Sequence, residues 1–188
     1  MKVIYKQSNS PLVISIPHSG TDIPQDIAPI CNLATKREHT DWALQELVAP
    51  LSETTLVANV SRYIVDVNRF KPRTKKATQP IIPRIDEVGN QLFNNYPSKQ
   101  KQADWLQRYY SPYYLHLENL LNEKLEQHER VLLVDLHSYD DKLFQTSDII
   151  LGTRKKQTIS PDILEKLLTK SFWHNSNASF MKKEYLLK

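Results

Sequence analysis

The chain has 188 residues, of which 40% are hydrophobic and 24% are charged, which is enough for one globular domain with its own core. No apolar run reaches transmembrane length, and the mixed, polar first residues do not predict a secretory signal. The single cysteine, Cys31, excludes an internal disulfide and favours a reducing, cytoplasmic compartment. We interpret Cys31 as an ordinary thiol, because no base stands beside it.

The net charge of +4 is unevenly distributed along the chain. Residues 151–188 carry eight Lys or Arg and three Asp or Glu. The rest of the chain carries 17 Lys or Arg and 18 Asp or Glu. A nucleic-acid-binding surface needs basic side chains spread over one face, with aromatic side chains among them. We therefore expect no nucleic acid and no membrane as partner. A second basic cluster, residues 71–76, is more typical of a rim around a site for small anions.

Short apolar runs bounded by turn residues predict five strands. In chain order these are Leu12–Ile16, Thr55–Val60, Tyr63–Val67, Val131–Leu136 and Asp148–Leu151. The fourth run is apolar at both alternating sets of positions, which predicts a central strand covered on both faces.

Helical patterns separate these runs. Thr35 and Glu38 form a capping box that predicts a helix toward Leu51. Apolar residues recur at helical spacing from Leu106 to Leu125, and Pro112 should kink that helix or begin a new one capped by Ser111. Residues 71–99 predict a long surface segment, and residues 159–170 predict a last helix. The alternation of strands and helices predicts an α/β domain with a largely parallel or mixed sheet.

The last 18 residues differ from the rest. We expect one domain over residues 1–170, followed by a divergent basic tail over 171–188 without a useful strand or helix period. Such a tail should not complete the sheet. An apolar sheet edge would then stay open and favour self-association.

Two histidines follow predicted strands. His18 ends the first apolar run and His137 ends the fourth, and each is followed by a serine. Because strand ends in one sheet lie side by side, the two imidazoles can converge on one point. Either histidine alone could simply cap its strand, and the paired occurrence is what favours convergence. Gly20 would let the chain turn sharply and let a ligand approach the backbone.

Asp41 is a third polar group in an apolar setting. It stands three residues before Leu44 and seven before Val48, on the apolar face of the predicted helix, where a lone carboxylate is costly. Two imidazoles, one carboxylate and water are the usual ligands of catalytic zinc. Two alternatives stay open. In one, Asp41 only interacts favourably with the helix dipole, and in the other, Glu38 is the ligand instead.

The stretch SRYIVDVNRF, residues 61–70, contains two arginines. Arginine suits recognition of a carboxylate by two parallel hydrogen bonds. The alternative is a structural pair between Arg62 and Asp66, with Arg69 in solvent.

Taken in order over residues 12–152, the strings PHSG, HTDW, SRYIVDVNR, PYY and DLHS resemble the N-formylglutamate amidohydrolase (N-formylglutamate deformylase) family. The resemblance implies a relative of the zinc carboxypeptidases with a three-layer α/β/α sandwich, incomplete on its C-terminal side. It implies a zinc-dependent, cytoplasmic amidohydrolase of histidine degradation, which removes the formyl group of N-formyl-L-glutamate or acts on a related N-acyl amino acid.

The resemblance also assigns candidate residues. The implied zinc ligands are His18, Asp41 and His137. The candidate substrate-binding residues, for a small carboxylate substrate, are Arg62, Arg69, Asn68 and Ser19.

The chain departs from the family pattern in places. The family usually has an acid at the position of His39 and a histidine at that of Tyr114. It also continues past residue 152 toward a late glutamate suited to be the general base, and Glu38 is the weak candidate for that role here. Two alternatives therefore stay open. One is a degenerate protein that binds small carboxylates without catalysis, and the other is a zinc amidohydrolase for another N-acyl amino acid or small peptide.

Overall fold

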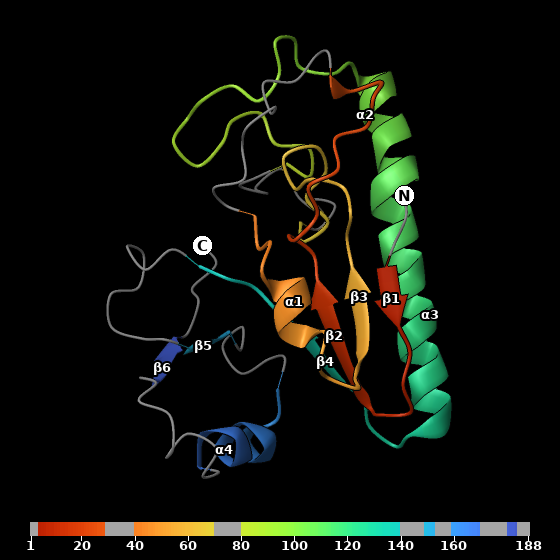
Figure 1. Cartoon of the computed structure of the whole chain (residues 1–188), viewed down its shortest axis with the longest axis vertical. Helices are drawn as coiled ribbons and strands as arrows, with labels where there is room; N and C mark the ends of the chain where they lie inside the picture. Colours follow the sequence, from red (N-terminus) through yellow and green to blue (C-terminus); the bar gives the residue numbers. More distant parts are fainter. Residues whose placement is uncertain are drawn as a thin grey trace. The chain divides into compact units, whose positions relative to one another are not determined.

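The computed structural model describes residues 4–28, 40–69, 80–139, 149–152, 159–169 and 180–183. The chain forms two compact units, residues 1–138 and residues 139–188 (Figure 1). The first unit contains a four-stranded sheet and the long helices, and the second contains a two-stranded sheet and one helix. In the described residues, no helix is long and apolar enough to cross a membrane.

The four-stranded sheet is mixed. Its order is β1 (Ile4–Lys6), β3 (Thr54–Val57), β2 (Leu12–Ile16) and β4 (Leu132–Asp135). β1 runs antiparallel to β3, whereas β3, β2 and β4 run parallel. The parallel register brings the carboxyl ends of β2 and β4 to one edge, since Ser15 lies opposite Asp135. The residues that follow these strands are therefore neighbours.

Helices cover both faces of this sheet, which confirms an α/β fold and gives three layers. On one face Ile14, Ile16 and Val57 pack against Leu44 and Val48 of α1 (Leu44–Val48). On the other face Leu56 joins the larger core. The helical side chains of that core are Trp105, Tyr109, Tyr110, Tyr113 and Leu120.

The helical pattern of residues 106–125 forms part of a longer rod (Figure 1). It consists of α2 (Lys99–Trp105), a π-helical segment (Leu106–Tyr110) and α3 (Ser111–Gln127). A new helix does begin near Pro112, but Ser111 is its first helical residue and not its cap. Because the chain is already helical there, no capping side chain is needed. The π-helical turn precedes the proline, which has no amide to donate.

Several predicted elements need correction. Tyr63–Val67 is buried but not a strand, because turns fold it through bonds such as Ile64 N to Ser61 O, at 2.9 Å. β4 is at the edge of the four-stranded sheet, with Leu132 and Leu133 36% and 37% exposed, and not central. In both places, apolar residues indicated burial and not position within a sheet. Thr35, Glu38 and Cys31 lie outside the described residues.

The second unit contains β5 (Ile149–Gly152), α4 (Pro161–Thr169) and β6 (Phe180–Lys183). The predicted strand and helix before residue 170 are thus present. β6 lies in the segment predicted as the tail and pairs with β5 in parallel register, so these four residues form a strand that the sequence pattern did not predict. A strand of four residues is too short to show a period in sequence.

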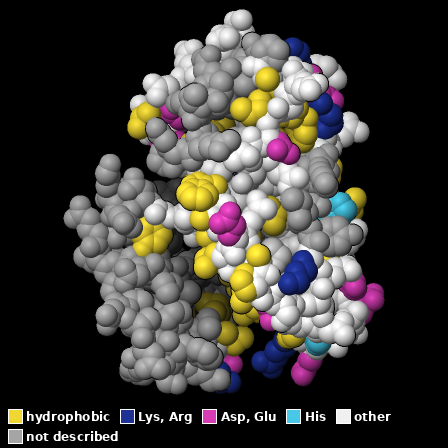
Figure 2. Space-filling view, in the orientation of Figure 1, with side chains coloured by type: hydrophobic (Ala, Val, Ile, Leu, Met, Phe, Trp, Pro, Cys, Tyr) yellow, Lys and Arg dark blue, Asp and Glu magenta, His cyan; other side chains and the backbone are white. Residues whose placement is uncertain are grey.

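Large apolar side chains are exposed around α1. Trp42, Leu47 and Leu51 are 64%, 65% and 45% exposed, and Figure 2 shows hydrophobic side chains gathered over this helix. Leu44 and Val48 of the same helix are buried against the sheet. α1 is therefore apolar on more of its surface than packing on the sheet requires.

Candidate metal site

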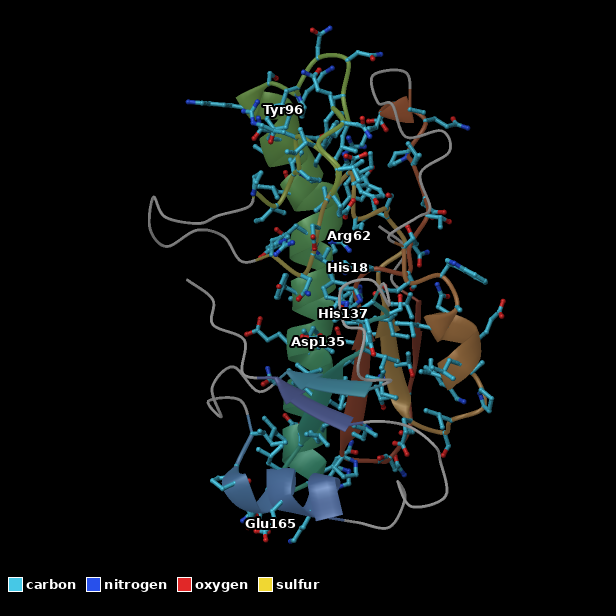
Figure 3. All side chains as sticks on the ribbon, turned by 90° about the vertical axis from the view of Figure 1, so that its left-hand side faces the viewer. His18, Arg62, Tyr96, Asp135, His137 and Glu165 are labelled. Atoms are coloured by element: carbon cyan, nitrogen blue, oxygen red, sulfur yellow. The ribbon has the colours of Figure 1, made fainter. Side chains whose placement is uncertain are left out.

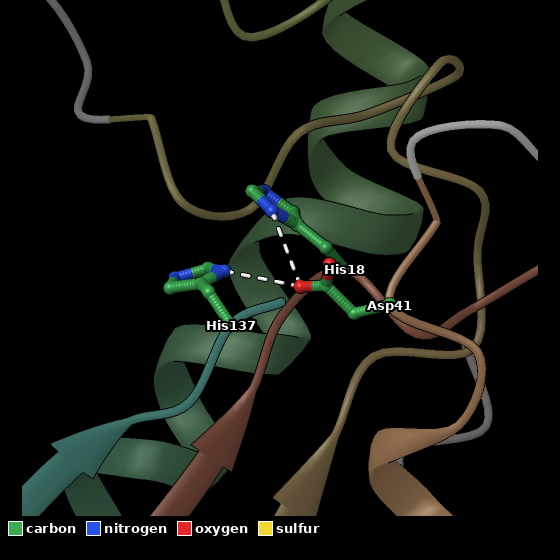
Figure 4. A group of neighbouring side chains, drawn as sticks. All are labelled: His18, Asp41 and His137. Carbon is green, nitrogen blue, oxygen red and sulfur yellow. Dashed lines mark hydrogen bonds and ion pairs between the residues drawn. The ribbon is translucent and has the colours of Figure 1, made fainter. Parts of the chain in front are cut away.

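The structure brings His18, Asp41 and His137 together beyond the carboxyl ends of β2 and β4 (Figure 4). One ligand atom from each residue lies within 4.8 Å of the other two. Asp41 Oδ2 is 3.2 Å from His137 Nδ1 and 4.0 Å from His18 Nδ1. The two imidazole rings lie 4.8 Å apart, centre to centre. All three residues belong to the first unit.

Asp41 is buried as predicted, but not on a helix. Its exposed fraction is 5%, and α1 begins only at Leu44. The backbone amide of Asp41 donates to the carbonyl of His18 at 3.0 Å, which ties its loop to the end of β2. The spacing to Leu44 and Val48 therefore indicated burial correctly, while a loop provides the position.

Asp66 holds the far side of the His18 ring. His18 Nε2 donates to Asp66 Oδ1 at 2.8 Å, and both side chains are about 6% exposed. This hydrogen bond leaves the lone pair of Nδ1 facing Asp41. Histidines that bind metals usually have such a carboxylate partner on the second nitrogen.

Two further polar side chains fix the other members. The Asn68 amide donates to His137 Nε2 at 3.1 Å, and Ser138 Oγ donates to Asp41 Oδ1 at 2.6 Å. Asp41 Oδ2 thus remains directed at the two histidines. Sequence reasoning did not assign roles to Ser138 or, beyond a possible pair with Arg62, to Asp66. The signal for Ser138 was its place directly after His137.

Both candidate substrate arginines contact Asp66. Arg69 Nε is 3.2 Å and an Arg62 terminal nitrogen 3.5 Å from Asp66 Oδ2. The same terminal nitrogen of Arg62 is also 4.0 Å from Glu87 Oε1. The side chain of Arg62 is 19% exposed and that of Arg69 is 37% exposed, so Arg69 is the more accessible of the two. Figure 3 shows Arg62 in the same region of the first unit as His18 and His137.

The electrostatics favour ionised carboxylates beside a neutral His18. Burial lowers the pKa of His18, although the hydrogen bond and charge of Asp66 oppose this. For Asp66, burial acts to raise the pKa, but His18 and the two arginines outweigh it and leave the pKa below its usual value. Burial likewise opposes, but does not cancel, the lowering of the Asp41 pKa by His137 and Ser138. Neutral imidazole and carboxylate are the forms that bind metals.

Gly20 is required by the close approach of two chain segments. A Cβ at this position would lie 2.4 Å from the carbonyl oxygens of Ala58 and Asn59. The segment after β2 therefore passes directly against the segment after β3, and only glycine fits. The adjacent Ser19 is 3% exposed, and its hydroxyl accepts a hydrogen bond from Gln45 Nε2 at 3.0 Å.

The donor set fits a divalent metal ion. Two imidazole nitrogens and one carboxylate oxygen are typical ligands of zinc in catalytic sites. Ligand atoms about 2.0–2.2 Å from a tetrahedral ion lie about 3.4 Å from one another. The two distances from Asp41 Oδ2 to the histidines, 3.2 Å and 4.0 Å, lie near this value, whereas the ligand atoms are up to 4.8 Å apart, so the histidines would move closer together around an ion.

The fold and this cluster together define an α/β protein with a candidate mononuclear metal site. The family model of N-formylglutamate amidohydrolase matches residues 10–181, and the chain belongs to this family. Two curated relatives, the N-formylglutamate deformylases of Pseudomonas putida and Pseudomonas aeruginosa, are each 29% identical over 180 residues. These alignments cover 87% of this chain and 66% of each relative, so the chain spans about two thirds of their length.

Solved structures support the fold. A crystal structure of N-formylglutamate amidohydrolase from Ralstonia eutropha matches 97% of this chain and 76% of its own, with a TM-score of 0.78 and 20% identity. A protein from Agrobacterium tumefaciens matches 96% of this chain and 71% of its own, with a TM-score of 0.69 and 16% identity. The α/β architecture is therefore shared with the solved N-formylglutamate amidohydrolase.

Proposed function

We propose that the chain hydrolyses the N-formyl or N-acyl amide of an acidic amino acid such as N-formyl-L-glutamate. One water is consumed, the amide C–N bond breaks, and the free amino acid leaves together with formate, or with the corresponding carboxylate where the acyl group is not formyl. The observation that carries this proposal is the convergence of His18, Asp41 and His137 in a member of this family. The names of the two curated relatives support the substrate. With that substrate, the reaction belongs to histidine degradation in the cytoplasm.

We propose zinc as the metal, held by His18 Nδ1, Asp41 Oδ2 and His137 Nδ1. Zinc bound there would lower the pKa of a coordinated water to about 7 and polarise the formyl oxygen. With its Nδ1 engaged, His137 carries its proton on Nε2, and the Asn68 amide can meet that proton with its oxygen. Asp66 keeps the proton of His18 on Nε2 in the same way.

Arginine side chains would orient the substrate. Arg69 uses Nε for Asp66, and its exposed guanidinium can offer further N–H groups to a substrate carboxylate. Arg62, Asn68 and Ser19 are proposed to complete this binding region. A carboxylate fixed in this way holds the formyl group in one orientation, which converts binding free energy into a lower barrier.

Glu38 is the proposed general base, and it lies outside the described residues. Asp41 and Asp66 are poor candidates for that role. Hydrogen-bonding partners surround both, Asp66 also contacts two arginines, and the pKa values of both carboxyl groups lie below the usual range. A group that accepts a proton near neutral pH works best with a pKa near that pH.

Formate release tests the proposed reaction. We expect the metal-free protein to gain activity on N-formyl-L-glutamate when one equivalent of zinc is added, and to lose it with a chelator. N-acetyl-L-glutamate, followed by acetate release, and N-formyl-L-leucine, followed by formate release, separate selection of the acyl group from selection of the side chain. Binding of N-formyl-L-glutamate without formate release would contradict the enzyme and favour a carboxylate-binding protein.

Arg69→Lys tests the role of the guanidinium. Lysine keeps the charge but loses the two-pronged geometry, so KM for N-formyl-L-glutamate should rise about tenfold or more while zinc affinity stays unchanged. Arg108→Lys is the matched control, because Arg108 forms exposed ion pairs with Asp26 and Asp104 instead. If Arg69→Lys weakens zinc binding as much as substrate binding, Arg69 supports the fold and does not bind substrate.

A further inference from the structure

A tight turn carries three of the polar side chains around the cluster. The turn runs from Asp66 to Arg69 and is closed by a bond from Arg69 N to Asp66 O at 3.2 Å. Asp66 Oδ1 also accepts from the backbone amide of Asn68 at 2.9 Å, as aspartates at the start of turns commonly do. Any movement of this turn would shift the partners of His18 and His137 together.

Two tyrosine hydroxyls donate hydrogen bonds to backbone carbonyls of this turn. Tyr114 donates to the carbonyl of Val67 and Tyr110 donates to that of Arg69, each at 2.8 Å. These carbonyls lie on either side of Asn68. Since a turn leaves such carbonyls without a partner in a sheet or helix, side chains must satisfy them when they are buried.

The helical rod presents both rings on one face toward the turn. Tyr110 is the last residue of the π-helical segment, and Tyr114 follows four residues later in α3, so the two share one face. Their ring centres lie 4.7 Å apart. Tyr113, the neighbour of Tyr114, instead forms a hydroxyl–hydroxyl hydrogen bond of 2.7 Å with Ser15 of β2. The helical rod is therefore hydrogen-bonded to the sheet through Tyr113 and to the turn through the adjacent Tyr110 and Tyr114.

We propose that Tyr110 and Tyr114 are positioning residues of the site, which hold the Asp66–Arg69 turn so that Asn68 meets His137 and Asp66 meets His18. That this site serves a metal rests on the proposed function, whereas the positioning of the turn does not. Both hydroxyls donate to backbone carbonyls of the turn. Their effect would pass through the backbone of the turn.

The chemistry of the two tyrosines suits this role. A phenol is a rigid donor that loses little side-chain freedom when it binds a carbonyl. Burial, aided by the neighbouring Tyr110, raises the pKa of Tyr114, so its hydroxyl stays protonated and keeps donating across the physiological range. The contact therefore does not depend on pH near neutrality.

Hydrogen exchange in the metal-free full chain tests the proposal. In a Tyr110→Phe, Tyr114→Phe double variant, the Asn68 backbone amide should exchange at least about tenfold faster than in the parent protein, because two hydrogen bonds that resist opening are lost. Tyr96→Phe is the matched control. Tyr96 makes the same kind of bond at the same distance, to Ile82 O at 2.8 Å, and lies well away from His18 and His137 in Figure 3.

In the Tyr96→Phe control, the exchange rate of the Asn68 amide should equal that in the parent protein, when both rates are normalised to those of the slowest core amides. Equal acceleration in the double variant and in Tyr96→Phe, or no acceleration in either, would overturn the proposal. Phenylalanine keeps both rings, so the double variant should fold, and single variants can replace it if it does not.

Zinc affinity provides a second measurement, by competition with a chelator. Partners beyond the ligands typically change metal affinity by 10–100-fold, and we expect the double variant to lose about tenfold while Tyr96→Phe loses none. If the parent protein binds no zinc, the proposed function fails, and exchange at Asn68 still decides the positioning role. If the parent binds zinc and the double variant binds it equally well, Tyr110 and Tyr114 do not position the site.

Discussion

Asp66 connects the basic and the histidine parts of the site. Its two oxygens contact His18, Arg62 and Arg69, and its side chain is 6% exposed. A buried carboxylate is tolerated only with several partners, and removing it leaves those partners without compensation. The same residue therefore supports both the stability of the first unit and the orientation of His18.

Asp66→Asn should lower the free energy of unfolding by about 3 kcal/mol, because it leaves two partly buried cations beside a neutral amide. Asp104→Asn is the control. Asp104 forms an ion pair with Arg108, in which the Asp104 side chain is 49% exposed and the Arg108 side chain 36% exposed, so the pair is expected to contribute at most about 1 kcal/mol. Urea unfolding of both variants makes the comparison. Equal losses would mean that burial of Asp66 does not matter.

The buried titratable groups predict loss of stability in acid for the metal-free protein. The pKa of His18 is lowered by burial, so the unfolded chain takes up a proton first and stability falls as pH drops below about 6.5. Asp41 and Asp66 also have lowered pKa values, so their contribution is present above about pH 4 and is lost below it. The free energy of unfolding should thus decline in two stages between pH 8 and pH 3.

His18→Gln should remove the first stage and keep the second. Urea unfolding at several pH values would show this as a flat region between pH 8 and pH 5. An unchanged slope in that region would assign the first stage to another histidine.

At the scale of elements, the packing of Gly20 against the β3 end is the tightest constraint described. Gly20→Ala would place a methyl group 2.4 Å from backbone atoms of Ala58 and Asn59, which cannot rotate away. We expect a loss of about 3 kcal/mol in the free energy of unfolding, at the upper end for overpacking. Gly89→Ala meets no atom within 4 Å and pays only for its φ of 92°, so its loss should be about 1–2 kcal/mol. A larger loss at Gly89 would contradict the close approach.

Helix α1 provides a matched pair of leucines. Leu44 is 7% exposed and packs on β2 and β3, whereas Leu47 is 65% exposed. Leu44→Ala should cost about 2–4 kcal/mol and Leu47→Ala less than about 0.5 kcal/mol. Thermal unfolding of the two variants checks this, and similar losses would mean that α1 does not pack as described.

At the scale of the whole molecule, the sequence predicted the fold better than the details of the site. The strand at Leu12–Ile16 and the helical spacing after Leu106 were evident, because burial imposes a period on each. The run at 63–67 was wrongly predicted as a strand. Its apolar residues indicated burial, and apolar residues suit a buried turn as well as a strand. The edge position of β4 was missed because an apolar pattern does not report strand order.

The three proposed ligands were predictable for two different reasons. His18 and His137 follow strands, and the parallel register makes such positions meet. Asp41 was found by its apolar spacing, although a loop holds it. The pair of Arg62 with Asp66 was one of the predicted alternatives. The contacts of Asp66 with His18, of Asn68 with His137 and of Ser138 with Asp41 could not be predicted, because they depend on distances between segments far apart in sequence. The tyrosine contacts with the turn likewise join segments far apart in sequence, which the helical spacing did not reveal.

The central claim is that His18, Asp41 and His137 form one zinc site. Anomalous X-ray diffraction at the zinc edge, from crystals of the full chain grown with one equivalent of zinc, tests it directly. The account predicts one strong peak within about 2.0–2.2 Å of His18 Nδ1, Asp41 Oδ2 and His137 Nδ1, and its loss in Asp41→Asn, His137→Ala crystals. No peak between these three atoms, or a stronger peak elsewhere in the chain, would contradict it.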